Sequence, residues 1–151
     1  VPAVESAHFA FHRGESTGRH RSYAYRFEAP DRVIVITGDT GPSDALTELA
    51  AGADILLTET TSAEDRRQAM IADGRWAAMS AAQQAGIMEQ ASRAHMTPES
   101  IGRMATRARV KSVVLTHLTQ RVGSSDYEPW AAEVRRLYDG PVTVARDLQR
   151  F

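Results

Sequence analysis

The sequence contains no cysteine, which excludes a disulfide framework, a thiolate zinc site and a cysteine nucleophile. Any bound metal must therefore depend on histidine, aspartate and glutamate. Long apolar runs are also missing, since stretches such as 33–36 and 113–115 are far shorter than the roughly 20 residues that cross a bilayer. The first residues show no leader pattern. We expect a soluble chain without a membrane partner, and both the cytoplasm and the periplasm stay open as its location.

An excess of charge of either sign is absent too. The 18 Lys and Arg residues balance 19 Asp and Glu residues, which leaves a net charge of −1. Nucleic-acid-binding proteins usually carry a basic excess that neutralises phosphates. A nucleic-acid partner is therefore disfavoured relative to a small-molecule substrate. With 151 residues, of which 42% are hydrophobic, the chain is long and apolar enough to bury a core as one domain.

Alternating strand and helix signals predict an α/β fold. Residues 22–28 and 33–36, separated by a Pro-Asp turn, predict a β-hairpin, and buried strands are expected at 54–59 and 110–117 with a last strand at 142–144. Capping signals predict three helix starts: Ser43 or Asp44, Thr97 followed by Pro98, and Ser125 or Asp126. The last of these helices is expected to carry Trp130, Val134 and Leu137.

The polar, alanine-rich stretch at 62–93 predicts two further helices, broken near Asp73 and Gly74. It resembles an insertion or a lid. The larger apolar residues of this stretch are Met70, Trp76, Met79 and Met88. They could line an apolar substrate lid, but packing in the core of the inserted helices is the favoured interpretation.

Titratable side chains stand where three predicted strands end. Asp39, Glu59 and His117 end or follow strands, and His95 stands just before the helix cap Thr97. Ligands of α/β sheets gather outside strand ends, so we expect these four side chains in one cleft. Two carboxylates and two imidazoles suit a metal such as zinc, and a carboxylate can orient a catalytic imidazole. Each residue taken alone also has an interpretation without function. Asp39 could form a turn, Glu59 could be exposed to solvent, and each histidine could be an ordinary hydrogen-bonded residue.

Four motifs in order carry a family resemblance: Gly-Asp-Thr-Gly-Pro-Ser at 38–43, Ala-Asp-Ile-Leu-Leu-Thr-Glu at 53–59, His-Met-Thr-Pro-Glu at 95–99, and Val-Val-Leu-Thr-His-Leu at 113–118. Together they resemble the second half of a metallo-β-lactamase-fold hydrolase, most similar to the ribonuclease Z and arylsulfatase-like branch. Residues 140–151 resemble the closing strand of that family. The resemblance implies half of a four-layer αββα fold over residues 1–151, with one mixed β-sheet, covering helices and a helical insertion at about 62–93.

The resemblance also implies a role for each site residue. Asp39 matches the carboxylate that bridges two metal ions, and His117 matches a histidine ligand of the second ion. His95 matches a catalytic proton donor, and Glu59 matches the acidic residue paired with it. The implied cofactors are two divalent metal ions, with zinc expected and Mn²⁺ or Fe²⁺ also compatible. His8 resembles a substrate-binding position at the rim of the site, although an exposed loop histidine is an equally good interpretation.

The other metal ligands of the family are absent. That family holds its first ion with a His-x-His-x-Asp-His loop and a further histidine, whereas His8, His12 and His20 have the wrong spacing. We therefore expect that this chain is part of a longer protein and that the missing N-terminal half of that protein is its partner. A two-chain assembly and a degenerate half are the alternatives. A sheet built to face a second sheet exposes apolar surface when alone, so the chain is expected either to be completed by its missing half or to self-associate as a homo-oligomer.

The function implied is that of a metal-dependent hydrolase. In it, a metal-held hydroxide attacks an ester, a sulfate ester, a phosphodiester or a lactone. The isolated chain is expected to be inactive. One alternative is a ribonuclease Z-like endonuclease that processes the 3′ ends of tRNA, and another is a non-catalytic half-domain that serves assembly.

Overall fold

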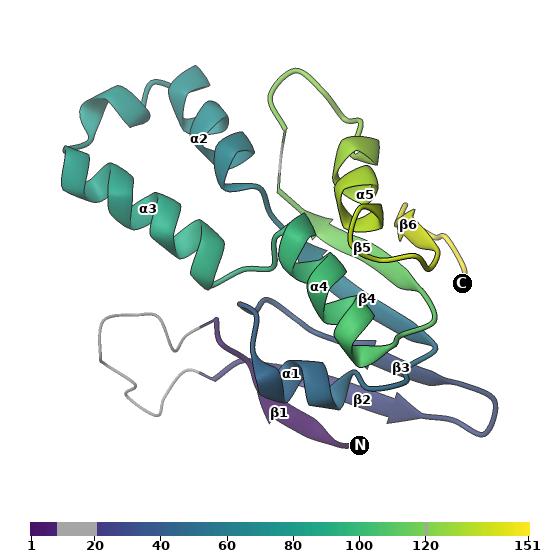
Figure 1. Ribbon diagram of the computed structural model, residues 1–151. Helices are drawn as coiled ribbons and strands as arrows, with labels where there is room; N and C mark the ends of the chain where they lie inside the picture. Colours follow the sequence, from purple (N-terminus) through teal and green to yellow (C-terminus); the bar gives the residue numbers. More distant parts are fainter. Residues whose placement is uncertain (9–20, 120) are drawn as a thin grey trace.

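The computed structural model of the protein describes residues 1–8, 21–119 and 121–151 (Figure 1). Within these ranges, six strands form one sheet in chain order: β1 (Ala3–Glu5), β2 (Tyr23–Glu28), β3 (Val33–Ile36), β4 (Ile55–Thr60), β5 (Val113–Leu118) and β6 (Val142–Val144). Strands β1 to β3 are antiparallel, and β3 to β6 are parallel. The predicted mixed sheet is confirmed.

The hairpin formed by β2 and β3 has the predicted form. Tyr25 pairs with Ile36 and Phe27 pairs with Ile34 across the two strands. Strand β1 was not predicted, because its three residues are too few to show a period of two. It lies beside β2, where Ala3 faces Tyr25, and it brings the following residues to the edge of the sheet at which the site lies.

The helices are α1 (Asp44–Leu49), α2 (Ala63–Ala72), α3 (Ala81–Arg93), α4 (Pro98–Ala108) and α5 (Glu128–Arg135), with a 3₁₀ turn, η2 (Trp76–Ala78). Ser43 and Thr97 cap α1 and α4 as predicted. The expected start of the last helix was wrong. Helix α5 begins later because Pro129 suits the first helical turn. The carboxylate of Asp126, which precedes the helix, accepts a hydrogen bond from the N–H of Glu128, the first residue of the helix. Leu137 lies beyond the end of this helix and is 36% exposed.

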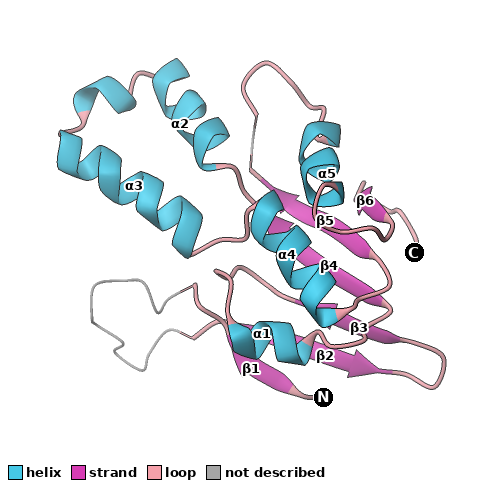
Figure 2. Cartoon of the chain, viewed as in Figure 1, coloured by secondary structure: helices cyan, strands magenta, loops and turns pink. Residues whose placement is uncertain are grey.

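The core lies between one face of the sheet and helices α1, α4 and α5, which stand in front of it in Figure 2. Leu46 of α1, Ile101 of α4 and Val134 of α5 are fully buried against Leu56 and Leu115 of the sheet. Each helix presents its apolar positions at helical spacing, so a single apolar stripe per helix is enough to cover this face. These helices fix the strands whose ends carry the candidate site.

The other face of the sheet carries a row of aromatic side chains from β2. Tyr23, Tyr25 and Phe27 are 37%, 42% and 42% exposed, and successive ring centroids lie 6.3 Å apart. Ile34 and Ile36 stand on the same face, because they pair directly with Phe27 and Tyr25. This open face has the apolar character expected of a sheet that packs against another layer.

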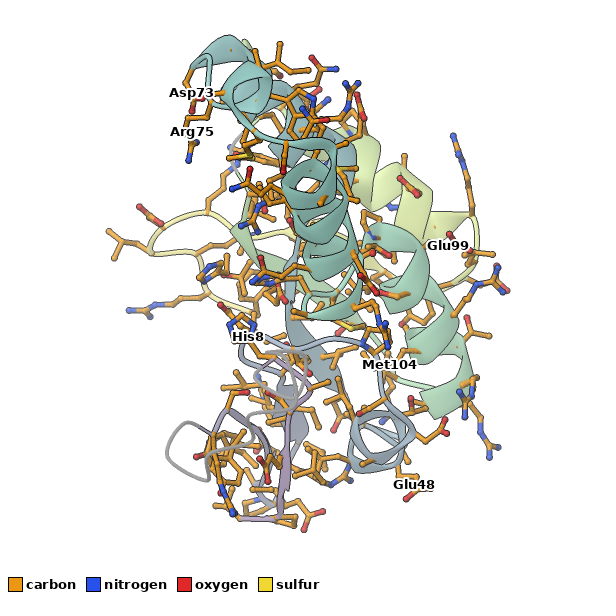
Figure 3. The ribbon with its side chains drawn as sticks, turned by 90° about the vertical axis from the view of Figure 1, so that its left-hand side faces the viewer. His8, Glu48, Asp73, Arg75, Glu99 and Met104 are labelled. Carbon is orange, nitrogen blue, oxygen red and sulfur yellow. The ribbon has the colours of Figure 1, made fainter. Side chains whose placement is uncertain are left out.

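Residues 63–93, here called the helical arm, extend away from the body of the molecule (Figure 1). In Figure 3, Asp73 and Arg75 mark its tip, and His8 lies near the end at which the arm joins the body. The Asp65 carboxylate near its base accepts a hydrogen bond of 2.9 Å from Nε1 of Trp130 in α5. Met70 is 6% exposed, which agrees with core packing for that residue.

No helix in the described part of the chain is long and apolar enough to cross a membrane.

Candidate functional site

Strands β3, β4 and β5 are parallel, so their carboxyl ends meet at one edge of the sheet. Asp39 follows β3 by three residues, Glu59 stands near the end of β4, and His117 stands near the end of β5. His95 reaches the same edge from the loop before α4. The contacts described below bring these four side chains together at this edge.

Glu59 and His95 form a partly buried pair. Nδ1 of His95 lies 3.0 Å from Oε1 of Glu59, and the two side chains are 14% and 2% exposed. The same carboxylate oxygen accepts hydrogen bonds from the backbone N–H groups of Thr40 and Met96, each at 3.2 Å. A buried carboxylate needs such partners. Because a carboxylate accepts, Nδ1 of His95 is the donor, and Nε2 is the ring nitrogen left for other chemistry.

The pKa of His95 is raised above its ordinary value. The hydrogen bond to Glu59 is the main cause, the charges of Glu59 and Asp39 act in the same direction, and burial and the positive charge of Arg66 oppose them. An imidazole of this kind holds its proton more firmly at neutral pH, which suits a group that donates a proton.

His117 is turned toward Asp39 by an irregularity in the sheet. The pairing of β4 with β5 shifts after Glu59, so that Thr60 faces Leu118 and His117 is the extra residue of a β-bulge. His117 has φ 45°, in the left-handed region. Its Nδ1 lies 3.6 Å from Oδ1 of Asp39, and its side chain is 69% exposed.

His8 belongs to the same cluster. The segment before it is bound to the loop of Asp39, since Ser6 Oγ donates to the carbonyl of Asp39 at 3.0 Å and the N–H of Ala7 donates to Thr40 Oγ1 at 3.0 Å. Nδ1 of His8 donates to the carbonyl oxygen of Ala94 at 3.1 Å. The rings of His8 and His95 meet edge to face with centroids 4.9 Å apart.

The base of the helical arm packs on the loop that carries Asp39. A Cβ atom at Gly41 would lie 1.8 Å from the carbonyl oxygen of Arg93, so only glycine allows the two backbones to approach this closely. The N–H of Thr61 donates to the carbonyl of Met96 at 2.9 Å, which ties the two ends of the arm together. Both ends of the arm therefore lie at the candidate site.

The donor set fits a divalent cation. One ligand atom each of His8, Asp39 and His95 lie within 4.8 Å of one another, and His117 approaches Asp39 at 3.6 Å. Ligands about 2.0 to 2.2 Å from a zinc ion stand roughly 3 to 4 Å apart, and the separation of His117 from Asp39 falls in that range. Imidazole and carboxylate are ligands that zinc, manganese and iron all accept.

Sequence reasoning identified the titratable residues of this cluster and missed its backbone donors. The N–H groups of Thr40 and Met96 carry no signal in the sequence, because their role depends on the path of the loops. Gly41 stands in the Gly-Asp-Thr-Gly motif, although the motif did not indicate a contact with Arg93. His12 and His20, whose spacing argued against a metal loop, lie outside the described residues.

Comparison with known proteins identifies the family. A model described as a β-lactamase superfamily domain matches residues 1–118. The ribonuclease Z of Haloferax volcanii is 31% identical over 122 residues, which are 81% of this chain and 32% of that protein. The ribonuclease Z of Myxococcus xanthus is 31% identical over 118 residues, which are 78% and 32% of the two chains. The chain thus spans about a third of the length of these relatives.

Solved structures agree on the fold. The metallo-β-lactamase-fold protein YhfI of Bacillus subtilis superimposes with a TM-score of 0.63 at 20% identity, over 95% of this chain and 45% of YhfI. The short form of human tRNase Z gives 0.52 at 22% identity, over 97% of this chain and 40% of that enzyme. Together with the family model, these likenesses show that the chain belongs to the β-lactamase superfamily and has the metallo-β-lactamase fold.

Proposed function

We propose that this chain provides part of the active site of a metal-dependent hydrolase that cleaves phosphodiesters. The observation that carries the proposal is the buried Glu59 carboxylate bonded to His95, beside Asp39 and His117. The names of the relatives, ribonuclease Z, support a phosphodiester as the substrate class. Esters, sulfate esters and lactones are the alternative substrate classes against which phosphodiester cleavage has to be tested.

Asp39 and His117 are the proposed metal ligands of this chain, and His8 is near enough to contribute at the rim. When bound, two divalent ions, with zinc as the first candidate, would activate water and neutralise charge on the substrate. A closed dinuclear site needs more ligands than these residues offer. We propose that the remaining ligands come from an N-terminal half that packs on the open face of the sheet.

His95 is the proposed proton donor to the leaving oxygen. Glu59 holds the Nδ1–H of the imidazole, so that Nε2 presents the proton to the substrate. The two backbone N–H groups on Glu59 keep the carboxylate in place while the imidazole changes charge. Protonation matters most for a leaving group that is unstable as an anion, such as the alkoxide of a ribose.

The test compares His95→Ala with His117→Ala in the full-length protein. His95→Ala should keep its metal and lose about 10²- to 10⁴-fold in kcat on an alkyl phosphodiester, with a much smaller loss on a nitrophenyl ester, whose leaving group needs no proton. His117→Ala should lose metal, measured by elemental analysis, and activity on every substrate. Equal losses on both leaving groups in His95→Ala would remove the proton-donor role.

Hydrolysis of a small organic ester is a second candidate, because the net charge of −1 and the pairing of surface arginines with carboxylates leave little attraction for a polyanion. A tRNA precursor with a 3′ trailer, a nitrophenyl phosphodiester and a neutral nitrophenyl ester separate the two. Preference for the neutral ester by kcat/KM would favour the second candidate. A metal-loaded protein with no turnover of any of them would favour the non-catalytic module.

A further inference from the structure

His8 stands at the end of the segment that follows β1, and the two residues before it are bound to the loop of Asp39. The hydroxyl of Ser6, a residue that is 4% exposed, donates to the carbonyl oxygen of Asp39 at 3.0 Å. The N–H of Ala7 donates to Oγ1 of Thr40, also at 3.0 Å. Both donors are held by the loop that carries a proposed metal ligand, so the backbone at His8 has a defined place beside the candidate site.

From this place the imidazole of His8 reaches the residue that precedes His95. Nδ1 of His8 donates to the carbonyl oxygen of Ala94 at 3.1 Å. Ala94 is fully buried at the C-terminal end of α3, where a helix leaves its last carbonyl groups without partners inside the helix. The hydrogen bond therefore satisfies a buried acceptor, and it holds the backbone from which the side chain of His95 extends.

The ring of His8 also packs against the ring of His95. The two centroids lie 4.9 Å apart and the ring planes meet at 74°, which is the edge-to-face arrangement that aromatic rings prefer. The hydrogen bond from Nδ1 of His95 to Glu59 fixes one corner of the ring. Because the terminal torsion of a histidine side chain is broad, one hydrogen bond alone leaves the ring room to rotate. The ring of His8 limits that rotation, so His8 and Glu59 hold the imidazole from two directions.

We propose that His8 is a positioning residue that sets the orientation of His95, so that Nε2 of His95 points at the leaving oxygen of the substrate. The inference rests on the proposed function, in which His95 donates a proton. A displacement of about 1 Å at a reacting group lowers the rate by roughly 100-fold, so the orientation of this ring matters for the proton transfer. One ligand atom of His8 lies within 4.8 Å of those of Asp39 and His95, which makes a metal ligand the alternative role to be separated by experiment.

The experiment separates the two contacts of His8 with three variants of the full-length, metal-loaded protein. His8→Phe keeps a ring that can meet His95 and loses the hydrogen bond to Ala94. His8→Asn keeps a side-chain N–H donor and loses the ring. His8→Ala loses both contacts. Glu5→Gln is the matched control, because Glu5 belongs to the same segment and its side chain is 54% exposed.

The expected result is a loss that depends on the leaving group. His8→Ala should lower kcat about 10- to 100-fold for a diribonucleotide, whose leaving group is a ribose oxygen, and no more than about twofold for bis(p-nitrophenyl) phosphate. His8→Phe and His8→Asn should each recover part of the loss, with KM and metal content as in the wild type, and Glu5→Gln should match the wild type throughout. Loss of metal in His8→Phe, equal losses of kcat on the two substrates, or no loss in His8→Ala would overturn the proposal.

The orientation of the His95 ring separates this proposal from the proposed function. Crystal structures of the full-length protein should show one ring orientation in the wild type, with Nδ1 on Glu59, and a turned ring or two orientations in His8→Ala. If the wild type cleaves neither phosphodiester but the ring moves in His8→Ala, the proposed function fails and the positioning role stands. An unchanged His95 ring in His8→Ala would overturn the positioning role whatever the activity.

Discussion

Replacing Gly41 by alanine tests whether the packing of the helical arm sets the geometry of the site. The new Cβ would lie 1.8 Å from the carbonyl oxygen of Arg93 and 2.9 Å from its carbon, whereas contacts under 3.0 Å are essentially never seen. Both atoms belong to the backbone, so no side chain can rotate away. The loop of Asp39 or the end of α3 must therefore move by about 1 Å. Overpacking of this kind costs about 1 to 3 kcal/mol of stability.

The effect on catalysis should exceed the effect on folding, because the displaced backbone adjoins both Asp39 and His95. A shift of about 1 Å at reacting groups lowers rates by roughly 100-fold. In the full-length protein, we expect Gly41→Ala to lose about 100-fold in kcat and part of its metal, measured by steady-state kinetics and elemental analysis. The control is Gly86→Ala in α3, where a Cβ meets no atom within 4 Å and should stabilise the helix by about 0.5 to 1 kcal/mol. Wild-type kcat, metal content and unfolding free energy in Gly41→Ala would refute the reasoning.

Most of the fold could be predicted because its signals are local. The hairpin at β2 and β3, the caps Ser43 and Thr97, and the break in the arm near Gly74 all follow from residue types at short spacing. The two features that were not predicted correctly, β1 and the start of α5, also have physical reasons. Strand β1 is too short to show a period, and the start of α5 depends on Pro129 rather than on the polar residues before it.

The candidate site could be predicted only in part. Residues at strand ends are visible in a sequence, so Asp39, Glu59 and His117 could be named, although their roles as ligands and catalytic groups remain predictions. The orientation of His117 depends on a bulge in the pairing of two strands that are far apart in the sequence.

Three further predictions concern strain, pH and the open face. In the metal-free protein, His117→Gly should raise the free energy of unfolding by about 1 kcal/mol in urea titrations, because φ 45° is unfavourable for any residue with a Cβ; a loss of stability would contradict this. Since the pKa of His95 is raised by Glu59, the pair stabilises the fold below the unfolded pKa of about 6.5, and the contribution is lost as pH rises through the folded value. Glu59→Gln should therefore destabilise the metal-free protein more at about pH 5.5 than at about pH 9, and equal losses would contradict the assignment. Tyr25→Asp tests the proposed packing partner of the open face. Tyr25 is 42% exposed in this chain, so the substitution should change the stability of residues 1–151 by no more than about 0.5 kcal/mol. In the full-length protein, a covered face would bury an unpaired carboxylate, which costs about 3 kcal/mol or more. Urea unfolding of both proteins measures the difference, and the same small change in both would mean that no second layer covers Tyr25.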